Sequence, residues 1–295
     1  MNGKILVVGG TGMLGRPVVR RLVHDGYRVR LMSHSPEKAR RIFGDDIEMV
    51  VGDVTAPETL AAPLEGCEAV YINLGARMDP DLFEAVEHRG TVNIVKAARE
   101  RDIGRIGMIS ALITGGVDSP YAYEAAKARA EMAVKAGGLP YTIFRCCWFF
   151  ESLPLYIQGK KAIYIGKLPH PVSWISTGDF AAMVSRSFNT DEAADKTFMV
   201  RGIEKMTIPE ALVKFCQVYD PAIKLSPIPL WAARLATLFS RRRQMKGLVQ
   251  FMKYVGTVPE PEGNGEADKI LGPALTTLTD WAEEYKAAKV ILGTK

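Results

Sequence analysis

Short apolar runs alternate with amphipathic segments through the first half of the chain. The amphipathic segments repeat their apolar residues every three or four positions, which is the spacing of one helix face. The apolar runs have the length of buried strands. This alternation predicts a parallel β-sheet with helices on both faces. The expected strands are residues 4–9, 27–33, 47–53, 69–75, 105–110 and 141–149, and the expected helices are residues 13–26, 36–43, 57–64, 80–101 and 119–136.

The pattern changes after about Glu151. Prolines and glycines interrupt an aromatic-rich segment, a composition typical of a pocket wall. A capped helix follows, and the rest reads as helices separated by proline-containing turns. We therefore expect an α/β fold with two parts. Residues 1–150 form a Rossmann-like, doubly wound parallel sheet, and residues 151–295 form a smaller, mostly helical substrate lobe, from which the segment at about 175–190 returns to the sheet domain.

The composition is that of an ordinary soluble globular protein, with 47% hydrophobic and 24% charged residues. No apolar run approaches the roughly 18 residues that cross a bilayer. A strand begins by Lys4, which leaves no room for a targeting peptide, so a cytoplasmic location is predicted. The net charge of +5 is modest and partly local, which argues against nucleic acid as a partner.

Cysteines and histidines show no metal-binding pattern. The four cysteines lack metal-ligand spacing and read as reduced thiols. His88 and His170 have no companion ligands nearby in the sequence. We expect no metal site.

Glycines are concentrated where the first strand meets the first helix. Gly9, Gly12 and Gly15 have the spacing G-x-x-G-x-x-G within a strand–helix–strand unit. A dinucleotide needs this arrangement, because the first glycine permits a tight turn, the second lets backbone N–H groups reach the pyrophosphate, and the third brings helix and strand close. The alternative is a glycine-rich turn without a ligand. Further candidate cofactor contacts in the same loop are Thr11, Met13 and Leu14.

The end of the second strand indicates which dinucleotide binds. Enzymes for the non-phosphorylated cofactor usually place Asp or Glu there, on the ribose hydroxyls. This chain has polar and cationic residues instead, which would accept a 2′-phosphate, so we predict NADP(H) in preference to NAD(H). The usual arginine is absent unless Arg16, after the third glycine, reaches across. The alternative is an ordinary polar strand end. The candidate phosphate ligands are Ser33, His34, Ser35 and Lys38.

Several segments together resemble the NmrA-like group of atypical short-chain dehydrogenase/reductases. They are GGTGMLG, VVGDV, INLGA, YEAAKARAE and LPYTIFRCCWFFES, followed by STGDFAAMV and LTTLTDWAEEY, so that the resemblance covers nearly the whole chain. It implies that Asp53 and Val54 lie at the adenine, and that Asn73, Leu74 and Gly75 line the path to the nicotinamide. The group contains working reductases and proteins that bind the nucleotide without turning it over.

Tyr123 and Lys127 are four residues apart and therefore share a helix face. A nearby ammonium lowers a phenol's pKa, which would help the phenol to protonate a carbonyl oxygen as hydride arrives. Lys127 would also hold the nicotinamide ribose, and Ser110, at the end of the fifth strand, would orient the carbonyl. These are the three roles that short-chain reductases use. The alternative is that Tyr123 merely packs on the sheet. A second match, Tyr156 with Lys160, lies in a proline- and glycine-broken segment and reads as accidental.

Aromatic residues gather where the sheet domain gives way to the second lobe. They would form an apolar substrate pocket or belong to the core. Arg145, inside the sixth strand, needs an acidic partner, for which Asp179 and Glu151 are candidates. The candidate pocket residues are Trp148, Phe149, Phe150 and Trp174.

Residues 230–255 are apolar and basic by turns. We favour a packed helix with a solvated arginine face, and contact with an anionic membrane is the alternative. Two main functions follow from the whole sequence: an NADPH-dependent reductase of a small, largely apolar carbonyl or related electrophile, or a regulator that binds NADP(H) and acts through a protein partner. A third, weaker interpretation is a quinone-linked or membrane-proximal protein that uses this basic segment. The expected assembly is a monomer or a homodimer.

Overall fold

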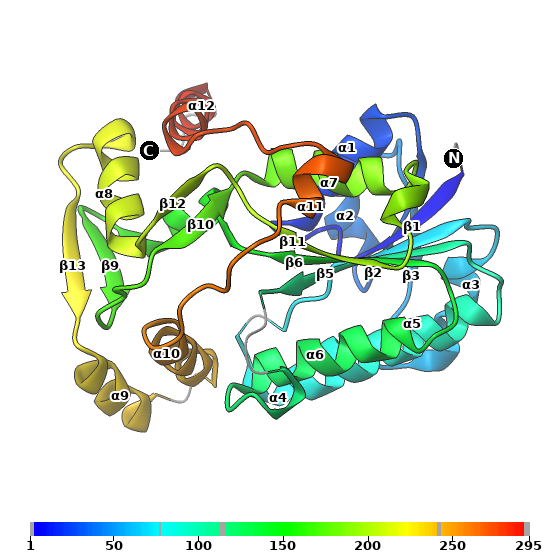
Figure 1. Cartoon of the computed structure of the whole chain (residues 1–295), viewed down its shortest axis with the longest axis horizontal. Helices are drawn as coiled ribbons and strands as arrows, with labels where there is room; N and C mark the ends of the chain where they lie inside the picture. Colours follow the sequence, from blue (N-terminus) through cyan, green and yellow to red (C-terminus); the bar gives the residue numbers. More distant parts are fainter. Residues whose placement is uncertain (1–2, 77, 113–115, 241–242, 292–295) are drawn as a thin grey trace. The chain divides into compact units, whose positions relative to one another are not determined.

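The computed structural model describes residues 3–76, 78–112, 116–240 and 243–291 (Figure 1). The chain divides into two compact units, and the division falls inside one helix. The first unit consists of Met1–Cys146, Phe180–Val200 and Asn264–Gly272. The second unit consists of Cys147–Asp179, Arg201–Gly263 and Pro273–Lys295.

A seven-stranded parallel sheet forms the centre of the first unit. Its strand order is β11-β6-β5-β4-β1-β2-β3. The predicted Rossmann-like, doubly wound sheet is therefore confirmed, with one further strand, β11, that the sequence pattern did not indicate. The strands are β1 (Lys4–Val8), β2 (Arg28–Ser33), β3 (Glu48–Val51), β4 (Ala69–Ile72), β5 (Arg105–Ala111), β6 (Tyr141–Cys146) and β11 (Lys196–Val200).

Helices cover both faces of this sheet, with α5 and α6 on one face and α1 and α7 on the other (Figure 1). Buried aliphatic residues on β4, such as Val70 and Ile72, belong to one core cluster with Ile94 of α5 and Val134 of α6. The helices are α1 (Gly15–His24), α2 (Pro36–Phe43), α3 (Ala61–Leu64), α4 (Pro80–Leu82), α5 (Gly90–Arg99), α6 (Ala122–Lys135), α7 (Thr177–Ser187) and α11 (Glu266–Leu271), and the 3-10 segments are η1 (Pro57–Thr59), η3 (Gly116–Asp118) and η5 (Asp191–Ala193).

Two predicted helices differ in detail from the observed ones. The helix expected from residue 119 begins at Ala122, because Tyr121 has an extended backbone and the Ser119 hydroxyl accepts the Tyr121 N–H in a turn before the helix. The helix expected over residues 80–101 contains a π-helical segment, η2 (Phe83–Arg89), between α4 and α5. Such wide turns are rare and are often found at functional sites.

The second unit contains strands as well as the expected helices. Two three-stranded sheets, β12-β10-β7 and β13-β9-β8, lie in it. The strand predicted over residues 141–149 is therefore split: β6 ends at Cys146, and Trp148–Phe149 pairs with β10. The strands are β7 (Trp148–Phe149), β8 (Ile157–Gln158), β9 (Lys161–Ile165), β10 (Val172–Ile175), β12 (Glu204–Met206) and β13 (Lys224–Ile228), and the helices are η4 (Phe150–Tyr156), α8 (Ile208–Tyr219), α9 (Leu230–Phe239), α10 (Arg243–Val255) and α12 (Leu278–Ile291).

Asp25, after the last turn of α1, connects this helix to α7 within the first unit. Its carboxylate accepts hydrogen bonds from Arg21 and Ser185, each at 2.6 Å. Burial alone would raise the pKa of Asp25, but the bonds from Ser185, Arg21 and His24 lower it from 3.8 to about 2. A carboxyl group whose pKa is lowered in the folded protein stabilises the fold above its unfolded pKa.

We expect Asp25→Asn to reduce the free energy of unfolding at neutral pH by roughly 1 kcal/mol, which is less than the pKa shift alone would give because solvent screens this exposed residue. The difference from the wild type should shrink as the pH falls from 3.8 to about 2, because both proteins then carry a neutral side chain. Urea unfolding at a series of pH values measures it. Asp45→Asn is the control, since that side chain is 92% exposed. An Asp25→Asn deficit that does not change with pH would contradict this account.

Candidate nucleotide-binding site

The loops after the parallel strands of the first unit lie at one edge of the sheet, because all seven strands point the same way. The chain passes outward from β1 to β2 and β3, and then returns to β4 on the other side of β1. Such a reversal of strand order leaves a crevice at the carboxyl ends of the two central strands, where ligands bind in doubly wound sheets. In this chain the reversal of strand order falls between β1 and β4.

The predicted cofactor residues are distributed over four of these loops. Gly9 to Gly15 follow β1, and Asn73, Leu74 and Gly75 follow β4. Ser33 ends β2, with His34 and Ser35 after it and Lys38 in α2. Asp53 and Val54 follow β3. The topology thus brings these short sequence motifs to the same edge.

Close packing requires the first and third glycines. Gly9 has a φ of +79°, and a Cβ atom there would lie 2.0 Å from the Asn73 carbonyl oxygen. A Cβ atom on Gly15 would lie 2.4 Å from the Gly9 carbonyl oxygen. The Asn73 side chain donates a hydrogen bond of 3.2 Å to that same oxygen. The two loops therefore approach so closely that only glycine fits at both positions.

Gly12 differs, because the protein's own packing does not require it. A Cβ atom there would meet nothing nearer than the Gly9 carbonyl oxygen at 3.4 Å, and the residue is exposed. A ligand that approaches the backbone from outside accounts for a glycine at this point. The start of α1 suits an anion, since no side chain caps it and its first turn has no acidic residue. These residues fit the pyrophosphate of a dinucleotide.

Three of the predicted 2′-phosphate ligands near the end of β2, His34, Ser35 and Lys38, are exposed, and Ser33 is partly buried. The Ser33 hydroxyl accepts the Ser35 N–H at 3.1 Å, and His34 Nδ1 lies 3.8 Å from the Asp53 carboxylate. The Thr55 hydroxyl and backbone N–H both bond to Asp53 and lower its pKa, so this carboxylate is charged. Arg16 donates from Nε to the Thr11 carbonyl at 2.8 Å, which holds its guanidinium beside the glycine loop.

Lys127 forms a buried ion pair that the sequence analysis did not anticipate. Its Nζ lies 2.9 Å from Glu87 Oε2, and it donates to the Ile109 carbonyl at 3.3 Å, next to Ser110. Burial alone would lower the pKa of Lys127, but the Glu87 carboxylate raises it above its usual value. Glu87 lies in η2 and also accepts the Ala76 N–H at 2.8 Å. The available signal was the position of Glu87 four residues after Phe83 and seven before Ile94, which places it on the buried face of its helix.

Tyr123 lies against the same lysine. Lys127 Nζ is 5.8 Å from the centre of the Tyr123 ring, and the Phe83 ring is 5.3 Å away. Burial raises the pKa of Tyr123 to about 12, since Glu87 offsets the lowering effect of Lys127. The expected fall in this pKa is therefore wrong: the lysine's charge is balanced by a carboxylate beside it. The phenol remains protonated at neutral pH.

Ser110 and Arg145 both form hydrogen bonds to the carboxylate of Glu131. The Ser110 hydroxyl donates to Glu131 at 2.7 Å, and Arg145 donates to the two oxygens of Glu131 from Nε and Nη2. The expected partners of Arg145 are wrong, because Glu131 on α6 faces β6 from within the same unit. Asp179 instead accepts backbone N–H groups at residues 275–276, and Glu151 accepts bonds from residues 177 and 281.

The predicted pocket aromatics all belong to the second unit, where they pack with one another. Phe150 and Trp174 have no exposed surface and lie nearly parallel at 6.3 Å. Trp148 is partly exposed and stacks on Phe251 at 5.4 Å. Most of these rings therefore belong to a core, as the alternative interpretation expected, and contact of any of them with a substrate stays a prediction.

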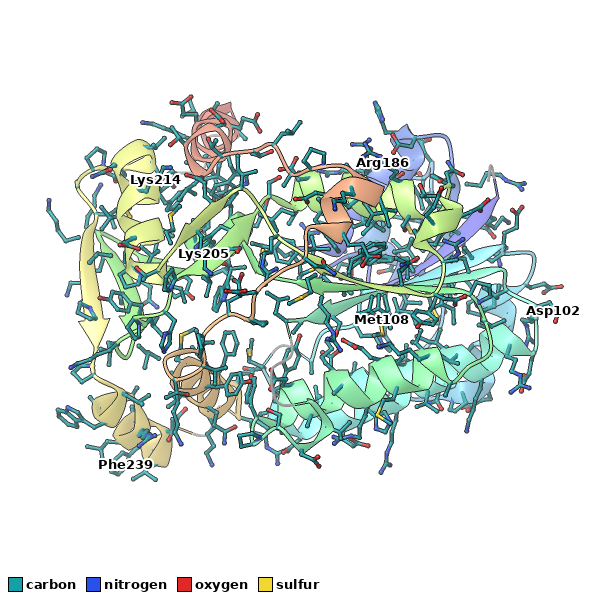
Figure 2. All side chains as sticks on the ribbon, in the orientation of Figure 1. Asp102, Met108, Arg186, Lys205, Lys214 and Phe239 are labelled. Atoms are coloured by element: carbon teal, nitrogen blue, oxygen red, sulfur yellow. The ribbon has the colours of Figure 1, made fainter. Side chains whose placement is uncertain are left out.

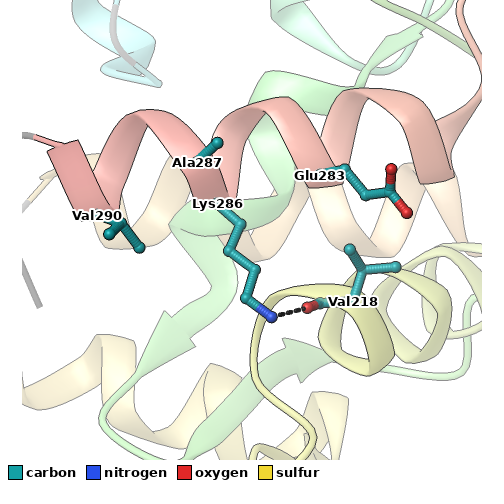
Figure 3. Close-up of a pocket in the computed structure, with 5 residues that line it drawn as sticks. All are labelled: Val218, Glu283, Lys286, Ala287 and Val290. Carbon is teal, nitrogen blue, oxygen red and sulfur yellow. Dashed lines mark hydrogen bonds between the residues drawn. The ribbon is translucent and has the colours of Figure 1, made fainter.

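A surface pocket of about 660 Å³ also lies in the second unit, between α8 and α12 (Figure 3). Lys286 donates to the Val218 carbonyl across it at 2.8 Å. None of the predicted site residues lines it. The lining residues are Val218, Glu283, Lys286, Ala287 and Val290.

Among the residues that the structure describes, no group of three or more His, Cys, Asp or Glu side chains is placed to hold a metal ion. Within the same residues, no helix has the length and apolar character needed to cross a membrane.

The reversal of strand order, the closely packed Gly9 and Gly15 and the start of α1 without a side-chain cap are features of dinucleotide-binding Rossmann folds. Comparison with known proteins agrees: the profile of the NAD(P)H-binding family matches residues 9–191, and the chain belongs to this family.

Several relatives cover most of the chain. It is 25% identical to an NAD(P)H azoreductase from Xenophilus azovorans over 96% of this chain and 98% of that protein. It is 27% identical to the photosystem II assembly factor Ycf39 from Trieres chinensis over 79% of this chain and 74% of that protein.

Solved structures share the fold. The triphenylmethane reductase of Citrobacter sp., complexed with NADP(H), has a TM-score of 0.76 at 16% identity, covering 96% of this chain and 99% of that one. The NADPH-dependent quinone oxidoreductase QOR2 of Escherichia coli, complexed with NADPH, has a TM-score of 0.76 at 17% identity, covering 95% and 99%.

Two glycine substitutions test separately whether each glycine is needed for nucleotide binding or for the protein's own packing. We expect Gly12→Ala to leave the free energy of unfolding within about 0.5 kcal/mol of the wild type but to weaken NADPH binding at least tenfold, because the added methyl group occupies the ligand's side of the loop. Gly15→Ala should cost roughly 2 kcal/mol of stability, since its Cβ meets backbone. Urea unfolding and fluorescence titration with NADPH measure the two effects. Unchanged NADPH affinity in Gly12→Ala would contradict the assignment of this loop.

Proposed function

We propose that this protein is an NADP(H)-dependent reductase of a small, largely apolar carbonyl compound or related electrophile. The observation that carries the proposal is the protonated phenol of Tyr123 beside the fixed charge of Lys127. Membership of the NAD(P)H-binding family supports a nicotinamide nucleotide as the cofactor. Relatives and structural neighbours named as azoreductase, triphenylmethane reductase and quinone oxidoreductase support reduction as the reaction class.

The bound nucleotide would supply the hydride, and the chain's own residues would manage the proton. Tyr123, whose pKa is about 12, keeps its proton at neutral pH and can give it to the more basic oxygen that forms on the substrate. The position of the Lys127 ammonium is fixed, because it forms an ion pair with Glu87 and donates a hydrogen bond to the Ile109 carbonyl. From there it would contact the nicotinamide ribose. For Ser110 to orient a carbonyl, its hydroxyl would have to leave Glu131.

Replacing Tyr123 by Phe tests the proton donor. We expect turnover on a panel of aldehydes, ketones and quinones to fall roughly 10² to 10⁴-fold while NADPH affinity stays unchanged, because only the hydroxyl is removed. Tyr156→Phe is the matched control, since Tyr156 and Lys160 repeat the spacing in the second unit. Equal turnover in wild type and Tyr123→Phe would exclude Tyr123 as the acid.

We also propose that the site prefers NADP(H) to NAD(H). The support is the group of exposed polar and cationic side chains at the end of β2, together with Arg16, whose guanidinium is held beside the glycine loop. A 2′-phosphate would gain charge-assisted hydrogen bonds from them.

Arg16→Ala and Lys38→Ala test this preference. Each should weaken NADPH binding roughly tenfold and leave NADH binding nearly unchanged, because only NADPH carries the 2′-phosphate. Fluorescence titration gives both dissociation constants. Lys96→Ala on α5, an exposed lysine in the same unit, is the control. Equal losses of affinity for NADPH and NADH would mean that these cations do not bind the 2′-phosphate.

A second candidate function is nucleotide binding without turnover, in the service of assembly or regulation. The hydrogen bond of one predicted catalytic group favours it, since the Ser110 hydroxyl donates to Glu131 and is not free to orient a carbonyl. Relatives named as photosystem II assembly factors point the same way. Retained NADPH binding with no reduction of any panel compound would favour this function over the first.

A further inference from the structure

Helix α9 of the second unit exposes an apolar face. Trp231, Leu235, Leu238 and Phe239 are 70%, 50%, 76% and 83% exposed. Their spacing of four, three and one residues places all four within one stripe of the helix. Arg234 on this helix is exposed, as the predicted solvated arginine face requires, but these four apolar side chains are exposed as well, which the prediction of a packed helix did not include. Figure 2 labels Phe239 at the last turn of this helix.

Exposed lysines lie on the helix next to this apolar stripe. Helix α10 follows α9 and packs against it, and Lys246 and Lys253, seven residues apart, are exposed on one of its faces. Between Asp220 and Glu260 the sequence contains seven Lys or Arg residues and no Asp or Glu. Two of the seven, Arg241 and Arg242, lie outside the described residues. The described part of the interval therefore has exposed cations and exposed apolar side chains on neighbouring helices.

We propose that α9 and α10 bind the surface of an anionic lipid bilayer, with α9 lying in the interface and the cations of α10 on the lipid headgroups. Interfacial helices combine these features: an apolar face containing Trp, Phe and Leu, and neighbouring Lys or Arg residues that attract anionic lipids. Neither helix is long enough to span a bilayer, so the contact is peripheral.

The charge pattern favours a bilayer over a second copy of the chain. Two copies docked through this surface would bring like charges together, since the interval has no acidic residue to pair with the cations of its partner. An anionic bilayer offers negative charge and an apolar interior at the same place. The exposed Trp231 also suits the headgroup region, where indole rings are enriched.

Flotation with lipid vesicles tests the proposal on the full chain. In low salt, the protein should float with vesicles of phosphatidylcholine and phosphatidylglycerol, and much less with phosphatidylcholine alone. High salt should weaken binding, because the headgroup attraction is screened. Wild-type protein that stays in the soluble fraction with anionic vesicles would overturn the proposal.

Two variant pairs separate the apolar from the charged contribution. Leu238→Ser with Phe239→Ser should reduce the bound fraction at least tenfold, whereas Leu155→Ser with Leu275→Ser, equally exposed elsewhere in the unit, should not. Lys246→Glu with Lys253→Glu should weaken binding at least tenfold, whereas the control with the same net charge, Lys161→Glu with Lys205→Glu, should change it little.

Two further measurements complete the test. Thermal unfolding of each variant verifies that the fold is retained, and none of these experiments requires nucleotide, so their outcome is independent of the proposed reductase activity. Equal losses in the control variants would overturn the proposal. A wild-type dimer that becomes monomeric in Leu238→Ser with Phe239→Ser would also overturn it, because the apolar face would then be a contact between copies.

Discussion

The close approach of two loops at the centre of the sheet is the constraint on which the site depends. Because β1 and β4 are neighbours, the Asn73 carbonyl and the Gly9 backbone meet with no room for a side chain between them. The Asn73 amide and Gly15 converge on the Gly9 carbonyl from other directions. This contact fixes the path of the glycine loop and the direction of α1. The open start of α1 and the exposed Gly12 are consequences of that path.

The sequence predicted what depends on local pattern. Six parallel strands, their helices and the glycine loop follow from apolar periodicity and turn chemistry, which are properties of neighbouring residues. The pattern does not reveal which sheet an apolar run joins, so Trp148 and Phe149 were assigned to the sixth strand although they pair with β10. β11 and the strands of the second unit were missed. β11 begins with two polar residues and β13 contains a proline, and both features weaken the strand signal.

The contacts of the charged groups around Tyr123 could not be predicted from the sequence. Glu87, Glu131 and the Ile109 carbonyl come from different elements, and only the fold brings them to Lys127, Ser110 and Arg145. The spacing of Tyr123 and Lys127 was read correctly as one helix face. The sign of the resulting pKa shift was not, because it depends on burial and on a carboxylate 36 positions away from the phenol along the chain.

The wide turn at Phe83–Arg89 determines where Glu87 lies, and this has a consequence for how the region can change. Each residue of an ordinary helix advances the chain by about 100° around the helix axis. Removal of a single residue from this turn would therefore rotate the carboxylate away from Lys127 and leave a buried ammonium without its counterion. Point substitutions on the outer surface of this turn are compatible with the ion pair, but insertions and deletions are not. The length of this segment is thus as much a part of the site as the identity of any residue in it.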